Sequence, residues 1–152
     1  MSTKEEDFMS ENTTIHAGQS ATQTAPISKR RLWTGRVMST LAALFLFVDG
    51  VMKLVKPASV VEATIQLGYP ENVIFGIGVV LLVCVLLYVI PNASILGAIL
   101  LTGYLGGAIA THVRVGNPLF SHTLFPVYIA LLIWGGLFLR EDRLRALIPL
   151  RR

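Results

Sequence analysis

Charged residues are scarce in this chain. Asp, Glu, Lys and Arg make up 14% of its 152 residues, whereas soluble domains carry about 25%. The deficit falls in the middle of the chain, where apolar residues run on with few interruptions. We interpret it as the composition of a chain whose middle cannot tolerate charge.

Cysteine is nearly absent as well, since Cys84 is the only one. An intramolecular disulfide and a dithiol redox centre are therefore excluded within this chain, and we expect Cys84 to act as a small buried hydrophobe. The sequence contains no nucleophile elbow, phosphate-binding loop or haem attachment motif, and no tight metal-ligand spacing such as HxxxH. We therefore assign no catalytic residue, expect neither a metal nor an intrinsic cofactor, and lean against an enzyme made of this chain alone.

Long apolar stretches are what the chain has in abundance. A helix that crosses a bilayer needs about 17–25 apolar residues at roughly 1.5 Å of rise each. Four stretches meet that requirement, at residues 37–55, 73–90, 93–113 and 119–139. The sequence therefore predicts an all-α integral membrane protein, a bundle of four spanning helices with the lipid bilayer as its first partner.

Basic residues gather just outside the apolar block. Nine of the 13 Lys and Arg residues lie in the segments 29–36 and 140–152. The positive-inside rule then places both chain ends in the cytoplasm, with the protein in the plasma membrane. It also accounts for the basic charge, so we expect no nucleic-acid partner. Residues 1–28 are polar and too poor in apolar residues to form a core, which predicts a disordered cytoplasmic tail before a transmembrane domain at 29–150.

Two segments carry signals of further local structure. Between the first two spans, Pro57 suits a helix start and Gly68 before Tyr69 suits a stop. The polar residues between them share one face, which predicts a short amphipathic helix on the outer surface. In the fourth span, Pro126 predicts a kink, and the pair Gly135–Gly136 predicts a close helix approach.

Small residues recur at every fourth position in the third span. They form two adjoining faces, and small residues allow helix backbones to approach closely in lipid. One such face would be typical of a dimer motif, so a homo-oligomer stays open. Two faces predict a helix that packs on both sides, central to the bundle. The predicted packing residues are Ala98, Thr102, Gly103, Gly106, Gly107 and Ala110.

Ionisable residues within the spans are candidates for function, because charge inside a membrane is costly. They fall in the predicted outer half, whereas the inner half shows almost no polar side chains. Asp49 and Lys53 are four residues apart, which favours an ion pair of functional or purely structural role. Arg114 could be an interfacial anchor or could turn inward to Asp49. The candidate ligand-binding residues are Asp49, Lys53, Tyr104, His112, Arg114 and His122.

Several motifs resemble the DoxX-like family of small membrane proteins. The longest is Gly97–Gly116, which reads GAILLTGYLGGAIATHVRVG. Others are Asp49-Gly-Val-Met-Lys-Leu before a proline, Leu67-Gly-Tyr-Pro, and the closing segment 140–149. The resemblance covers about residues 36–150 and implies a four-helix membrane bundle. The wider family includes small subunits of a thiosulfate:quinone oxidoreductase and membrane partners of thiol and superoxide defence proteins, but it implies no residue-level catalytic assignment.

Three functions remain open on these observations. The first is an accessory subunit of a membrane redox assembly that binds a quinone or another lipid-soluble small molecule in its outer half. The second is a small transporter or channel, which the apolar inner half disfavours. The third is a structural protein whose third span binds another membrane chain, such as a redox partner.

Overall fold

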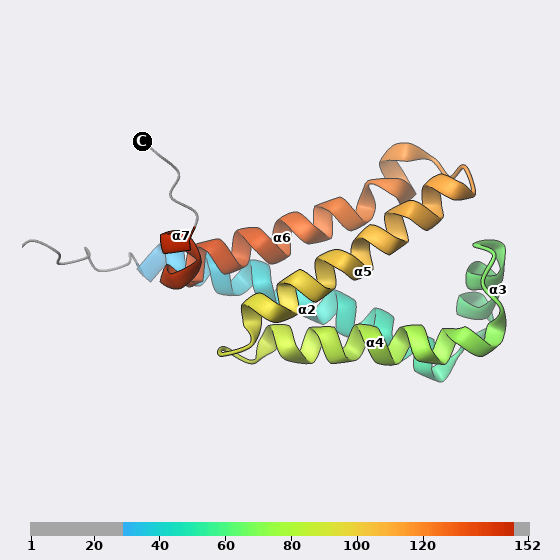
Figure 1. The fold of residues 1–152 in the computed structure, drawn as a ribbon, viewed down its shortest axis with the longest axis horizontal. Helices are drawn as coiled ribbons and strands as arrows, with labels where there is room; N and C mark the ends of the chain where they lie inside the picture. The colour runs from blue at the N-terminus through green and yellow to red at the C-terminus, as the bar shows by residue number, and fades with distance from the viewer. Residues whose placement is uncertain (1–28, 148–152) are drawn as a thin grey trace, which may run out of the picture.

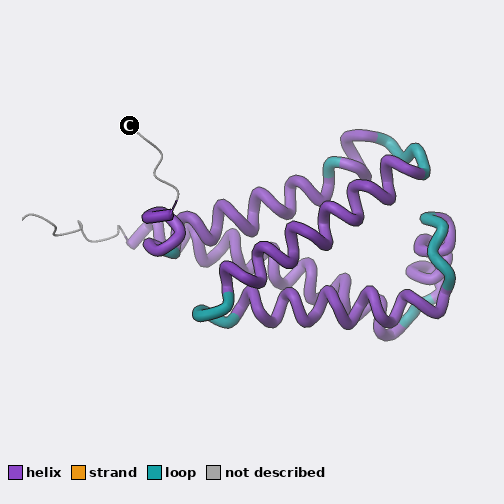
Figure 2. Tube along the Cα trace, in the orientation of Figure 1, coloured by secondary structure: helices purple, strands orange, loops and turns teal. Residues whose placement is uncertain are grey.

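The computed structural model describes residues 29–147, and this part of the chain consists of helices joined by short loops and turns, with no strand (Figure 2). The first helix and the surface helix after it are α2 (Lys29–Val55) and α3 (Ala58–Gln66). The next two long helices are α4 (Glu71–Val89) and α5 (Ser94–Arg114). The last three elements are the π-helix η1 (Leu119–Thr123), α6 (Phe125–Arg140) and α7 (Asp142–Leu147).

The predicted all-α four-span architecture is confirmed. Within residues 29–147, four helical segments are long and apolar enough to cross a membrane, at Lys29–Val55, Glu71–Val89, Ser94–Arg114 and Leu119–Arg140. The first begins at Lys29 instead of residue 37, because Lys and Arg are good helix formers and extend the helix beyond the apolar stretch. The disordered tail predicted for residues 1–28 lies outside the described residues.

The spans run alternately up and down, which gives the bundle two distinct ends (Figure 1). At one end, α2 begins, α6 ends and a tight turn joins α4 to α5; we call it the terminal end. At the other, α3 and η1 connect the spans; we call it the loop end. Both ends of the described chain therefore lie on the same side of the bundle, as an even number of spans requires.

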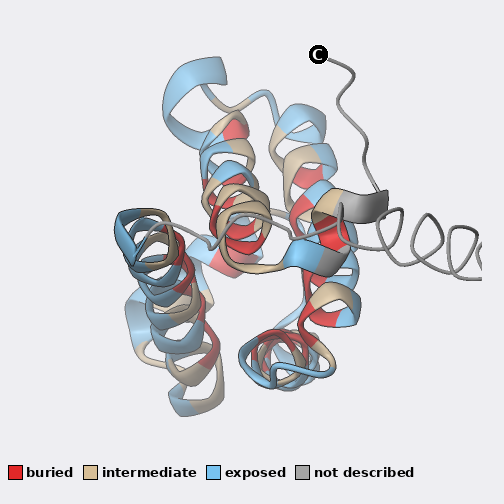
Figure 3. Ribbon diagram, turned by 90° about the vertical axis from the view of Figure 1, so that its left-hand side faces the viewer, coloured by how far each residue is buried: buried red, intermediate tan, exposed pale blue. Residues whose placement is uncertain are grey.

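The helix at the centre of the packing is α2. It makes the most extensive contacts in the bundle, with α6 and α4, whereas α5 packs mainly against α4 and less closely against α6. The expectation that the third span is the central helix is therefore wrong for this chain. The side chains that face between the helices are buried, and the outward faces are exposed (Figure 3).

Glycine sets the two close approaches of α2. Near the terminal end, a Cβ added at Gly136 of α6 would lie 2.9 Å from the Ser39 backbone nitrogen and 3.0 Å from the Gly35 carbonyl oxygen. Nearer the loop end, a Cβ at Gly78 of α4 would lie 2.8 Å from the Lys53 Cβ and 3.1 Å from the Gly50 carbonyl oxygen. The close approach predicted for Gly135–Gly136 is thus present, and α2 leans on α4 at one end and on α6 at the other.

Large apolar side chains cover the outer faces of the bundle. Leu44, Leu86 and Leu131 are 57%, 61% and 64% exposed, respectively. Monomeric soluble proteins rarely expose contiguous apolar surface of this kind. In a bilayer the same surface contacts lipid at no cost, so the exposed faces agree with the spanning interpretation.

Both predicted local features appear, one of them in a different form. The surface helix α3 begins directly after Pro57, and the exposed Ser59, Glu62 and Gln66 lie along it. Pro126, in contrast, does not kink a continuous helix. The π-helix η1 ends at Thr123, and α6 then begins at Phe125 with Pro126 in its first turn. A proline is well tolerated there, because the first backbone N–H groups of a helix have no partner within the helix.

Candidate functional site

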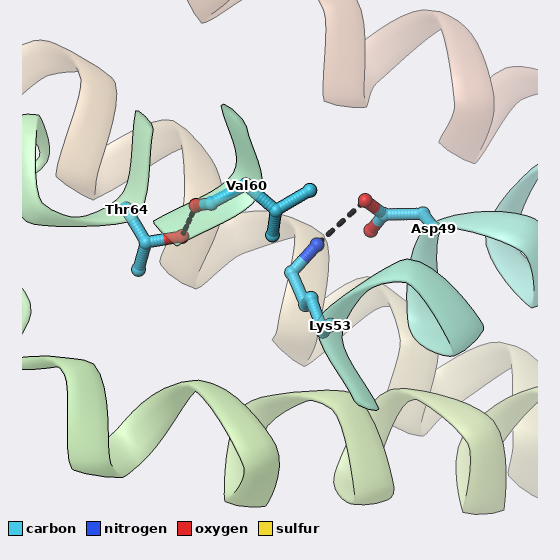
Figure 4. A network of polar contacts seen from close by, with 4 residues as sticks. All are labelled: Asp49, Lys53, Val60 and Thr64. Carbon is cyan, nitrogen blue, oxygen red and sulfur yellow. Dashed lines mark hydrogen bonds and ion pairs between the residues drawn. The ribbon is translucent and has the colours of Figure 1, made fainter. Parts of the chain in front are cut away.

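An ion pair lies inside the loop-end half of α2. The Lys53 ammonium donates to the Asp49 carboxylate, with 2.6 Å between Nζ and Oδ1. The two side chains point toward one another beside Val60 and Thr64 of α3 (Figure 4). Their side chains are 18% and 38% exposed for Lys53 and Asp49, respectively. The predicted pairing is confirmed, and the pair is neither sealed in the core nor fully open.

The contact between α2 and α4 holds this pair in place. The Lys53 stem packs against Gly78, whose missing side chain leaves room for it. On the neighbouring α5, Tyr104 is half-buried and packs against the core. The polar groups that α2, the turn before α4, and α5 carry on this side of the bundle are called the loop-end site: Asp49, Lys53, Tyr69 and Tyr104.

Arg114 has a structural contact of its own. Its Nη2 donates to the Leu67 carbonyl oxygen at 2.7 Å, and its guanidinium lies 5.8 Å from the centre of the Tyr69 ring. The Tyr69 hydroxyl in turn lies 2.8 Å from the Thr111 hydroxyl. Gly68, at φ +83°, brings the turn within reach of Arg114. Arg114 thus fastens the turn between α3 and α4 to the end of α5 and does not pair with Asp49.

The two candidate histidines come together from the last turn of α5 and from η1. The rings of His112 and His122 are 6.0 Å apart between centres. The Asn117 amide lies 2.8 Å from His112 Nδ1, and the Ser121 hydroxyl lies 2.8 Å from His122 Nδ1. Among the residues that the structure describes, no three His, Cys, Asp or Glu side chains are grouped as metal ligands. The histidines form a polar turn at the loop end of the bundle.

Only some of the packing residues predicted on α5 contact another helix. Ala98 is buried, and Thr102 accepts a hydrogen bond of 2.8 Å from the Trp134 indole of α6. Gly103, Gly106 and Gly107 are exposed, and a Cβ added at any of them would meet nothing within 4 Å. Ala110 is exposed as well. Within residues 29–147 the small face of α5 therefore has no helix against it.

The sequence interpretation missed a polar cluster at the terminal end. Tyr88, which is 1% exposed, places its hydroxyl 2.9 Å from Ser39 Oγ and 3.1 Å from the Ile133 carbonyl oxygen. Arg140 lies over the Tyr88 ring, 5.3 Å from its centre, and its Nη2 lies 3.4 Å from the Tyr88 carbonyl oxygen. The expectation of an almost apolar inner half is wrong at this point.

A signal for this cluster was present in the sequence. Ser39, Tyr88 and Arg140 lie at the ends of three different apolar stretches that an up-and-down topology brings to the same side. From the sequence, the three residues are interpreted as separate interfacial residues. The pattern of one helix does not show that its polar residue contacts the polar residues of the other helices.

These features define the class of protein before any comparison. The chain is a multi-pass membrane protein, with four apolar spans among residues 29–147, lipid-facing outer surfaces and charged groups towards the two ends of the bundle. A family model described as the DoxX-like family matches residues 37–136. This protein belongs to the DoxX-like family, as the resemblance in its motifs indicated. Comparison with curated proteins and with solved structures gives no match.

Proposed function

We propose that this DoxX-like protein is an accessory subunit of a membrane redox assembly, and that its loop-end site binds a small lipid-soluble molecule of the quinone type. The observation that carries the proposal is the partly exposed Asp49–Lys53 ion pair within a spanning helix. Ionisable residues at such depth are costly and mark binding or transport paths by default.

The chemistry of the loop-end site suits a carbonyl ligand. The Lys53 ammonium has three N–H donors, of which Asp49 accepts one, and Tyr104 of α5 carries a further hydroxyl. A quinone oxygen accepts hydrogen bonds and carries no charge, so it can enter through lipid. Asp49 would balance the charge of Lys53 while the ligand binds. Arg114 and His112, two of the candidate residues named from the sequence, are already bonded to neighbouring groups.

An accessory role fits the rest of the chain. The sole cysteine, Cys84, is 5% exposed and lies in the core of α4. A thiol relay would therefore need groups supplied by another protein. The loop-end site supplies hydrogen bonds and charge, and electron transfer would belong to the partner.

Binding of a short-chain benzoquinone to the purified protein in lipid nanodiscs tests this proposal. Lys53→Met should weaken binding about tenfold, because a hydrogen bond from a charged donor contributes about 1.5–3 kcal/mol. Tyr104→Phe should weaken it by a smaller factor, and Glu62→Gln, on the exposed surface of α3, serves as the matched control. A parent protein that binds no quinone, or folded Lys53→Met and Tyr104→Phe variants that bind as well as the parent, would contradict the proposal.

The proposed orientation places both chain ends in the cytoplasm of a plasma-membrane protein. Support comes from Lys29, Arg30, Arg31, Arg36 and Arg140, all at the terminal end, against fewer basic residues at the loop end. Ser59→Cys, placed on exposed α3 in a Cys84→Ala background, should react with a membrane-impermeant maleimide in intact cells. Labelling only after the cells are opened would reverse the orientation.

A second candidate function rests on the exposed small face of α5. Gly103, Gly106 and Gly107 leave a backbone surface on which another membrane helix could pack closely. Under this proposal the protein acts as a structural partner, and Gly103→Leu or Gly107→Leu should abolish co-purification of that partner while the bundle itself stays folded. Retention of the partner by both variants would reject the candidate.

A further inference from the structure

A groove opens on the surface at the terminal end, far from the loop-end site. It has a volume of about 320 Å³ and lies between α2 and α4. Its apolar walls include Leu44 and Phe47 of α2 and Val85 and Val89 of α4. Its polar lining comes from Thr40 and from the cluster of Ser39, Tyr88 and Arg140.

The course of α2 explains why the groove exists. α2 touches α4 at the pair Gly50 and Gly78, and it then leans toward α6, which it meets at Gly35 and Gly136. A wedge therefore opens between α2 and α4 toward the terminal end. From residue 39 to residue 47 the wedge runs for about 12 Å at the rise of an α-helix. This length is close to the ~15 Å that one leaflet contributes to the hydrocarbon core.

The groove ends on an arginine whose charge has no counter-ion in the described chain. The ion pairs found between residues 29 and 147 are Asp49–Lys53 and Asp142–Arg145, and neither involves Arg140. Within the same residues, Arg140 Nε is buried without a hydrogen-bond partner, and Nη2 makes a single long bond of 3.4 Å. A charge at a membrane bundle normally has a partner, because leaving it uncompensated is costly.

We propose that this groove binds one anionic phospholipid. The phosphate oxygens would accept hydrogen bonds from the Arg140 guanidinium, and one acyl chain would lie along the wedge between α2 and α4. The proposal rests on charge and shape together, since a single cation stands at the end of an apolar channel one leaflet long. A basic pocket between spanning helices is a recognised form of lipid headgroup site. A free phosphate would leave the apolar walls uncovered.

The distribution of charge around the groove favours an anionic headgroup over a zwitterionic one. Arg36 lies on the same helix as the groove lining, and Arg30 and Arg31 lie one to two turns earlier. Basic side chains near the membrane surface attract an anionic headgroup. An anionic lipid would therefore gain from Arg140 directly and from its neighbours at longer range.

Lipid titration of the purified full-length protein in mild detergent tests the proposal. Phosphatidylglycerol and phosphatidylcholine with identical acyl chains are compared by native mass spectrometry and by the melting temperature. The parent should bind phosphatidylglycerol about tenfold more tightly than phosphatidylcholine. Arg140→Gln should remove most of this preference, and Arg140→Lys should retain part of it, because lysine keeps the charge but loses the bidentate geometry.

Further variants distinguish lipid binding in the groove from non-specific attraction to surface charge. Thr40→Phe, at the groove wall, should weaken the binding of both lipids, whereas Leu41→Phe, exposed on the same helix but outside the groove, should not. Arg36→Gln serves as the charge control and should leave most of the preference intact.

The outcomes against the proposal are equally specific. A parent protein without preference between the two lipids, or Arg140→Gln with undiminished preference, would overturn it. If Arg140→Gln lowers the melting temperature equally with either lipid, the guanidinium is paired within the chain and the proposal fails. Inorganic phosphate that displaces phosphatidylglycerol at similar concentration would show an anion site without a lipid channel, which is also a refutation. The loop-end proposal is unaffected by each of these results.

Discussion

One substitution made at two positions of α5 should have opposite effects on stability. A Cβ at Gly97 would lie 2.5 Å from Tyr88 Cα and 2.7 Å from the Leu87 carbonyl carbon, both backbone atoms of α4. Ordinary contact begins near 3.4 Å, so Gly97→Ala would have to move α4 and α5 apart by about 1 Å. Gly103, in the same helix, has nothing within 4 Å of the added atom.

The magnitudes follow from these distances. Overpacking in a well-packed interior costs about 1–3 kcal/mol, and the upper end applies at Gly97 because neither backbone can swing aside like a side chain. Gly103→Ala should instead be neutral or stabilising by up to about 1 kcal/mol, through helix propensity. The two variants should differ by about 2–4 kcal/mol, which corresponds to roughly 5–15 °C in melting temperature for a chain of this size.

Thermal unfolding in mild detergent, followed by circular dichroism on protein shown to be monomeric, measures this difference. The monomer condition matters, because a partner on the small face of α5 would make Gly103→Ala costly for a separate reason. A Gly97→Ala variant as stable as the parent, or a Gly103→Ala monomer that loses as much as Gly97→Ala, would refute this packing of α5 against α4.

Three further predictions concern single polar groups. Tyr88→Phe should lower the free energy of unfolding by about 1–2 kcal/mol in chemical denaturation, because it leaves buried acceptors without their donor; an unchanged midpoint would contradict this. For the half-buried ion pair, Asp49→Asn and Lys53→Met should each cost about 2 kcal/mol and the double variant less than their sum, and strict additivity in the cycle would show that the pair does not interact. Cys84 should resist a water-soluble maleimide in the folded protein and react after denaturation, whereas rapid labelling of the native protein would place the thiol at an accessible surface.

The spans and the local pairs could be predicted from the sequence with good accuracy. Apolar length identifies a spanning helix because the bilayer imposes a fixed thickness. The pairing of Asp49 with Lys53 follows from their spacing on one helix, and it needs no knowledge of the other helices. The start of α3 after Pro57 is likewise a local property of proline.

The order of packing could not be predicted in the same way. In lipid, a helix face toward a neighbour and a face toward the bilayer are both apolar, so hydrophobicity does not distinguish them. Small residues mark where close approach is allowed, but α2, α4, α5 and α6 all contain glycine. The bundle uses Gly50 with Gly78 and Gly35 with Gly136, and it leaves Gly103 and Gly107 uncovered.

Contacts between polar side chains of different helices could not be predicted from the sequence either. Arg114 carries two acceptable interpretations in the sequence, and the position of the turn at Leu67 decides between them. Arg140 and Ser39 lie far apart in the chain and come to one groove because α2 leans from α4 toward α6. Such contacts between side chains of different helices depend on the angles at which the helices cross, and no single stretch of sequence encodes these angles.

The contact between α2 and α6 joins the first described span to the last. This interface is among the most extensive in the bundle, yet it cannot form until α6 has been synthesised. The tight hairpin of α4 and α5 can assemble earlier, since its contacts are local and close quickly. Before α6 is synthesised, the surface of α2 around Gly35 lacks the helix that it contacts in the finished bundle. Completion of this bundle therefore depends on the synthesis of α6, and a chain interrupted before α6 would lack the helix that closes the bundle.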